Sequence, residues 1–139
     1  LNILLQDYAD AVWNGLLTCE IANGLEDLRA RTLRARWLVV SGGDQEELRR
    51  VFQHRGLREI FDGGIFGSPR TKDEILDCEI RCGNVTKPAI FFGDSKYDHE
   101  AASRSNIDFL FMSAWSEFHD WEKYCEENSV PTIECISSL

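Results

Sequence analysis

The chain has 139 residues, of which 43% are hydrophobic and 28% charged, a composition that predicts one α/β domain with its own core. Its 24 acidic and 15 basic side chains give a net charge of −9, which argues against a nucleic-acid partner. No apolar run approaches the roughly 20 residues of a membrane span, there is no signal-peptide pattern, and five scattered cysteines favour reduced thiols. We therefore expect a cytoplasmic protein without a membrane partner.

Helical and extended patterns alternate along the chain. Helical periodicity and helix-start signals predict helices at residues 4–17, 24–30, 45–54, 73–81, from 100 onward, and 116–128. Short apolar runs predict strands at residues 37–40, 65–66, 89–92, 109–112 and 132–135. The run at 89–92 is apolar throughout, which predicts a strand that is buried on both faces. Strands that alternate with helices predict a parallel, doubly wound sheet.

Polar groups that could bind a ligand occur after a strand, at Ser41, and before a helix, at Lys72. Ser41-Gly42-Gly43 ends the strand at 37–40, and a hydroxyl beside unobstructed backbone N–H groups suits a phosphate oxygen. Lys72 lies in a loop just before a helix, where its ammonium could neutralise a phosphate or an aspartate. The alternatives are a tight turn for the first stretch and a surface lysine for the second.

Two carboxylates, Asp94 and Asp98, follow the strand at 89–92. Ligands of open α/β sheets lie just beyond the carboxyl ends of the strands. Two acids at that position suggest an oxygen-ligated cation, and Mg²⁺ is the default when phosphate is nearby. The alternative is that Asp98 caps the following helix and Asp94 is a solvated turn residue.

The stretches around Ser41, Lys72 and Asp94 occur in the same order, and at the same places relative to strands, as motifs of the haloacid dehalogenase (HAD) superfamily of phosphotransferases. They resemble those motifs. The stretch 39–43 looks like the second motif, Lys72 within 68–72 resembles the third, and 92–98 is similar to the fourth. The form Gly-Asp-Ser-x-x-Asp resembles the Mg²⁺ phosphatase branch more than the true dehalogenases. The helix at 24–30 resembles the one that precedes the second motif in phosphoglycolate-phosphatase-like members.

The resemblance implies a Rossmann-like three-layer sandwich with a mostly parallel sheet. It also implies hydrolysis of a small phosphorylated metabolite through an aspartyl-phosphate. Ser41 and Gly42 would hold the phosphoryl oxygens, Lys72 would steady them and the nucleophile, and Asp94 and Asp98 would hold Mg²⁺.

The first motif of the family, a strand that ends in Asp-x-Asp, is missing: no Asp-x-Asp occurs in the sequence. Asp7 and Asp10 have the wrong spacing and lie in a stretch of helical periodicity. We therefore expect residues 1–17 to be the last helix of a truncated helical cap, and residues 18–139 to be a core that lacks its nucleophile strand. The expected partner is a missing N-terminal segment, and the chain by itself should be inactive.

In the family, the nucleophile strand lies between the strands that end here at Ser41 and Gly93. These two strands should therefore not pair directly, and their facing edges should keep unpaired backbone groups. A different possibility is a non-catalytic binding or regulatory domain with the same fold. A receiver-like domain is a weaker alternative, because its acids and lysine occur in the opposite order.

Overall fold

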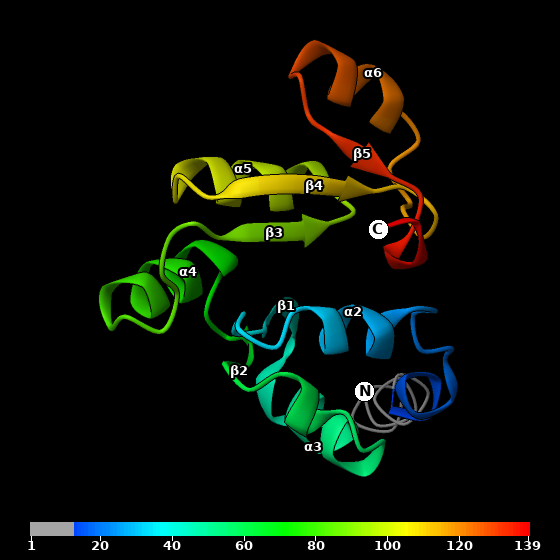
Figure 1. Cartoon of the computed structure of the whole chain (residues 1–139), viewed down its shortest axis with the longest axis vertical. Coiled ribbons are helices and arrows are strands. Elements are labelled where there is room, and N and C mark those ends of the chain that lie inside the picture. The colour runs from blue at the N-terminus through cyan, green and yellow to red at the C-terminus, as the bar shows by residue number, and fades with distance from the viewer. Residues whose placement is uncertain (1–12) are drawn as a thin grey trace, which may run out of the picture.

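The computed structural model describes residues 13–139 (Figure 1). Residues 13–18 are helical, and the rest of the helix predicted at 4–17, with Asp7 and Asp10, lies outside the described residues. The further helices are α2 (Leu25–Arg31), α3 (Gln45–His54), η1 (Arg58–Ile60), α4 (Lys72–Arg81), α5 (Lys96–Arg104), α6 (Trp121–Glu127) and η2 (Ile136–Ser138). The strands are β1 (Leu38–Asp44), β2 (Gly64–Ser68), β3 (Ile90–Gly93), β4 (Asp108–Met112) and β5 (Thr132–Ile133).

The five strands form two separate parallel sheets, one of β1 and β2 and one in the order β3-β4-β5. The α/β class and the parallel pairing predicted from the sequence are confirmed. Within residues 13–139 no strand pairing joins β1 to β3, as the resemblance implied. The register between β1 and β2 shifts between Val40 and Asp44, where the Ser-Gly-Gly stretch lies.

The outer edge of β2 is closed by two side chains of α3. Arg49 Nε donates to the backbone oxygen of Ile65 at 2.9 Å, and Gln45 Oε1 accepts from the backbone nitrogen of Gly67 at 3.3 Å. One helical turn separates these two residues, so α3 caps an acceptor and a donor of the same strand edge. No such capping bond reaches residues 38–40 of β1 or 90–92 of β3 from the described part of the chain.

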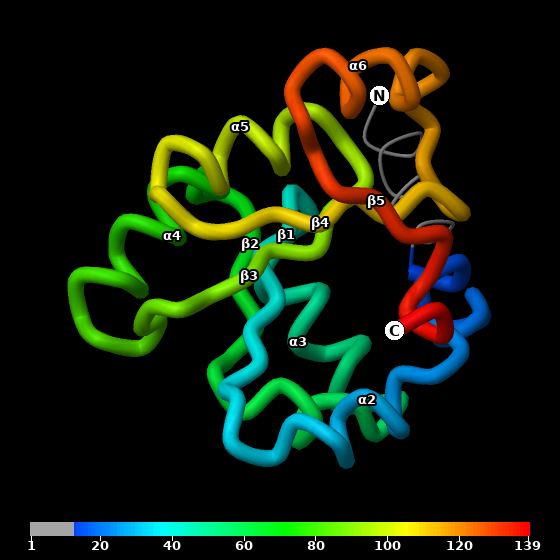
Figure 2. Tube along the Cα trace, turned by 45° about the horizontal axis from the view of Figure 1, so that its top comes forward, coloured from blue at the N-terminus to red at the C-terminus, as the bar shows by residue number. Residues whose placement is uncertain are grey.

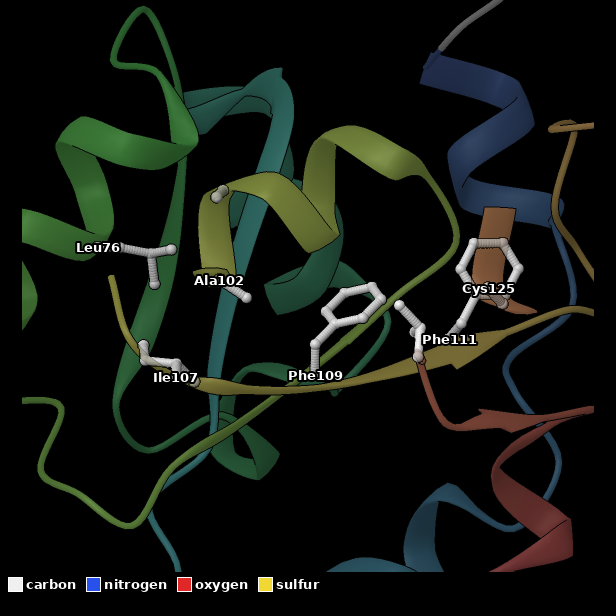
Figure 3. Packing of buried hydrophobic residues seen from close by; sticks show 8 residues of the cluster. Leu76, Ala102, Ile107, Phe109, Phe111 and Cys125 are labelled. Carbon is white, nitrogen blue, oxygen red and sulfur yellow. The ribbon is translucent and has the colours of Figure 1, made fainter. Parts of the chain in front are cut away.

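A hydrophobic core joins the two sheets. Phe109 and Phe111 of β4 pack with Ala101 and Ala102 of α5, and Figure 3 shows these rings along one face of β4. Val40 of β1 packs against the same cluster. In Figure 2, α5 follows the β3–β4 pair along its length. The core therefore connects the two sheets.

The expectation that the strand at 89–92 is buried on both faces is wrong. Ile90 is 53% exposed and Phe92 37% exposed, whereas Phe91 packs into the core beside Phe109. Successive side chains of a strand point to opposite faces, and α5 covers the Phe91 face. The apolar run correctly indicated a parallel strand, but among the described residues the Ile90 face of β3 lacks comparable cover.

The starts of three helices also differ from expectation. Lys72 is the first residue of α4 and not a loop residue, and Asp98 lies inside α5, which starts at Lys96. The last long helix was expected from Ser116 but begins at Trp121. No helix within residues 13–139 is both long and apolar enough to cross a membrane.

Asp44 caps α3, because its side chain accepts from the backbone nitrogen of Glu47 at 2.9 Å. We expect Asp44→Ala to lower the free energy of unfolding by about 1 kcal/mol, since the substitution removes the cap. Urea denaturation would measure the loss. Asp120→Ala is the matched control, because Asp120 is the N-cap of α6 and makes no side-chain capping bond. Equal losses in the two variants would contradict the capping role of Asp44.

Candidate active site at the strand ends

Lys72 and Asp98 form an ion pair between the first turns of α4 and α5. Thr71 begins α4 with a full capping box that includes Glu74, and this fixes the position of Lys72. The Lys72 ammonium contacts Asp98 Oδ1, and only 3% of the Asp98 residue is exposed. A buried carboxylate needs such a partner, so this lysine is no free surface residue.

Asp98 does not cap its helix. The N-cap of α5 is Ser95, whose hydroxyl accepts from the backbone nitrogen of Asp98 at 3.2 Å. The second oxygen of Asp98 accepts from the backbone nitrogen of Asp94 at 3.2 Å. Each oxygen of this carboxylate is therefore engaged, one by Lys72 and one by the Asp94 amide. The capping alternative for Asp98 is wrong.

Gly93 makes the close approach of Asp98 possible. A Cβ added at Gly93 would lie 2.5 Å from Cβ and 2.8 Å from Oδ2 of Asp98, and 2.8 Å from a ring carbon of Phe109. Carbon atoms do not approach this closely, so a larger residue would displace the carboxylate. The lack of space for a side chain therefore explains why a glycine precedes Asp94.

The Asp94 carboxylate accepts no side-chain hydrogen bond among residues 13–139, although the Asp94 backbone nitrogen donates to Asp98 of the ion pair. Burial is the main cause that raises the pKa of Asp94 above its ordinary value, and the negative charge of Asp98 raises it further. Lys72 lowers this pKa, while Glu117 adds a smaller rise. A bound cation would relieve the repulsion at this position.

Sequence reasoning missed Ser116. Its hydroxyl donates to the backbone oxygen of Asp94 at 2.6 Å and accepts from the backbone nitrogen of Phe118 at 3.1 Å. A serine hydroxyl that binds the amide two residues on competes with helix formation, and this explains why α6 starts later than expected. No local pattern could have indicated the contact with Asp94, which is 22 residues away in sequence.

Ser41 lies within β1, which continues to Asp44, and its hydroxyl accepts from the backbone nitrogen of Gly43 at 3.0 Å. No hydrogen bond within the described part of the chain joins Ser41 to Lys72 or to the aspartates. Asp44 pairs with Ser68, and a Cβ on Gly67 would overlap the Gly43 oxygen, so the Ser41-Gly42-Gly43 stretch of β1 lies against the end of β2. The phosphate-binding role of Ser41 and Gly42 stays a prediction.

Among residues 13–139 no group of three His, Cys, Asp or Glu side chains could enclose a metal ion. Mg²⁺ does not require such a group, since proteins often hold it through one or two carboxylates together with phosphate oxygens and water. The Asp94 carboxylate, which accepts no side-chain hydrogen bond among residues 13–139, suits one of these positions. The donor set is thus compatible with Mg²⁺ as part of a larger site.

Comparisons with known proteins bear on the fold. No family model matches the sequence, and no curated protein matches it. A solved structure, a HAD-superfamily hydrolase from Ehrlichia chaffeensis, superposes with a TM-score of 0.64 at 18% sequence identity. The match covers 86% of this chain but 55% of that one, so this chain spans about half the length of that hydrolase. The described residues therefore have a HAD-like α/β fold.

Proposed function

We propose that this chain carries the phosphate- and metal-binding part of a Mg²⁺-dependent phosphatase that hydrolyses a small phosphomonoester. We assign it to the phosphoglycolate-phosphatase-like branch of the HAD superfamily. The observation that carries the proposal is the cluster of Lys72, Asp94 and Asp98 beside the carboxyl end of β3, in a fold similar to that of a HAD hydrolase.

Each residue has a distinct role in this proposal. Lys72 supplies positive charge to the phosphoryl oxygens and to the attacking carboxylate. Asp94 is the carboxylate that would hold Mg²⁺, which when bound offsets the charge between nucleophile and phosphate. Asp98 belongs to the same metal site, and its two hydrogen bonds hold Lys72 and the Asp94 backbone in place. Ser41 and the backbone N–H of Gly42 would bind equatorial phosphoryl oxygens.

The nucleophile of the proposed reaction is an aspartate outside the described residues, because the chain has no Asp-x-Asp. An oxygen of this carboxylate attacks phosphorus, the bond from phosphorus to the substrate oxygen breaks, and the leaving oxygen takes a proton. Water then attacks the aspartyl-phosphate, which releases inorganic phosphate and restores the carboxylate.

We propose that the nucleophile lies on a strand between β1 and β3. Both strands keep an uncapped edge within the described residues, in contrast to the capped outer edge of β2. Unpaired strand edges are costly and are normally paired or covered. A further segment would also shield the exposed side chains of Ile90 and Phe92. Residues 1–17 would be the last helix of a cap that covers the site.

A second candidate is a non-catalytic binding or regulatory domain, which the missing Asp-x-Asp favours. The two functions differ in turnover. We expect a polypeptide that joins residues 1–139 to the residues encoded just before them to release p-nitrophenolate from p-nitrophenyl phosphate in the presence of Mg²⁺. EDTA should abolish the release, and the 139 residues alone should give none.

Two results would decide against the phosphatase. Phosphate binding without turnover by the longer polypeptide would support the binding domain. Turnover by the 139 residues alone would place the nucleophile within this chain and overturn the proposed position of the missing strand.

A further inference from the structure

The backbone is held on both sides of the Asp94 side chain. The amide before it donates to Asp98, and the carbonyl after it accepts from Ser116 Oγ at 2.6 Å. These two bonds fix the peptide groups that flank the Asp94 Cα. They therefore set the direction in which the carboxylate leaves the backbone.

Ser116 is itself held firmly. Its hydroxyl accepts from the backbone nitrogen of Phe118, whose ring packs against Tyr124 with centroids 5.5 Å apart and borders the core cluster. On the other side, the backbone nitrogens of Ser113 and Ala114 donate to the backbone oxygens of Ile133, the last residue of β5, and of Glu134, each at 2.9 Å. The segment 113–118 is thus anchored at both ends, and its serine hydroxyl is not a freely rotating surface group.

The same segment brings a further charge toward the site. Glu117 follows Ser116, and its carboxylate is one of the groups that raise the pKa of Asp94. Residues beyond β4 therefore act on Asp94 in two ways, through a hydrogen bond to its backbone and through charge.

We propose that Ser116 is a positioning residue for the metal-binding carboxylate of Asp94, and that residues 116–118 form a wall of the metal site. The inference rests on the proposed Mg²⁺-dependent function. A hydroxyl donor is required at this position, so threonine should replace serine and alanine should not. Groups that orient the ligands of a metal commonly change its affinity by about 10- to 100-fold when they are removed.

The test is a titration of the longer polypeptide with MgCl₂, followed by NMR through the backbone amides of Gly93, Asp94 and Ser95. We expect Ser116→Ala to weaken Mg²⁺ binding by about 10-fold, and Ser116→Thr to restore it. Ser113→Ala is the matched control, because the Ser113 hydroxyl donates to the backbone oxygen of Ile133 at 3.3 Å from within the same segment. This control should bind Mg²⁺ as the unchanged protein does, and thermal unfolding of all variants shows whether each is folded.

Unchanged Mg²⁺ affinity in Ser116→Ala, or an equal loss in Ser113→Ala, would overturn the inference. If the unchanged protein itself shows no saturable Mg²⁺ shift, the Mg²⁺ part of the proposed function fails. In that case hydrogen exchange of the Asp94 amide decides about Ser116. Faster exchange in Ser116→Ala than in Ser113→Ala supports its positioning role, and equal exchange refutes it.

Discussion

Asp94→Asn is expected to abolish Mg²⁺-dependent turnover by the longer polypeptide and the stabilisation of the fold by Mg²⁺. The substitution keeps the size of the side chain but removes the charge that a hard cation requires. If Mg²⁺ binds only the folded state, a concentration about 100 times its Kd should stabilise the unchanged protein by about 2.7 kcal/mol. Mg²⁺ should not stabilise the Asp94→Asn variant. Thermal unfolding of both proteins with and without MgCl₂ measures the stabilisation.

The pH dependence of folding stability, measured without metal, gives a second readout of the Asp94 charge. Because the pKa of Asp94 is raised in the folded state, the folded protein holds its proton to higher pH than the unfolded chain does. The stability that the Asp94 side chain contributes, relative to the uncharged amide of Asp94→Asn, is therefore greatest in acid. It falls as the pH rises from the ordinary aspartate range through the raised pKa. Above that pKa, without Mg²⁺, Asp94→Asn should be more stable than the unchanged protein.

Asp120→Asn is the control for both measurements, since Asp120 is an exposed aspartate at the start of α6 that makes no side-chain capping bond. It should leave the response to Mg²⁺ unchanged. If Asp94→Asn retains Mg²⁺-dependent turnover, Asp94 does not belong to the metal site. If its stability advantage does not grow with pH, the electrostatic account of Asp94 is wrong.

Local sequence patterns predicted that Asp94 follows a strand and that Lys72 lies at the start of a helix. Asp94 and Lys72 were identified because a strand end or a helix start is visible within a few residues of sequence, and the structure brings both to Asp98. The separation of β1 from β3 followed from the missing first motif and not from any local pattern. The structure confirms that separation within the described residues.

Long-range contacts could not be predicted in the same way. The contact of Ser116 with the Asp94 backbone depends on how β4 pairs with β3, and β5 with β4, in one sheet. The exposure of Ile90 and Phe92 depends on which helices cover β3, whereas the apolar run by itself matches a strand buried on both faces. The strand that was expected to end before Ser41 continues to Asp44, and the Ser41 hydroxyl accepts from the backbone nitrogen of Gly43 two residues on.

Lys72→Met is expected to destabilise the fold by about 3 kcal/mol, because it leaves the Asp98 carboxylate buried without its counter-ion. The two partners are not equivalent. The Lys72 side chain is 28% exposed and can turn its ammonium into water, whereas the Asp98 side chain is 5% exposed and cannot leave. Asp98→Asn should therefore cost less than Lys72→Met, since the amide oxygen can still accept from the Asp94 backbone nitrogen.

Urea denaturation of the two single variants and of the double variant Lys72→Met/Asp98→Asn completes a thermodynamic cycle. The double variant should recover most of the loss, because no uncompensated charge remains. Arg81→Met is the control on the same helix, since Arg81 pairs with Asp77 while both side chains are largely exposed, and its cost should be below about 1 kcal/mol. If Lys72→Met costs no more than Arg81→Met, Asp98 does not depend on Lys72 for its charge. The lysine would then be free to serve the phosphate alone.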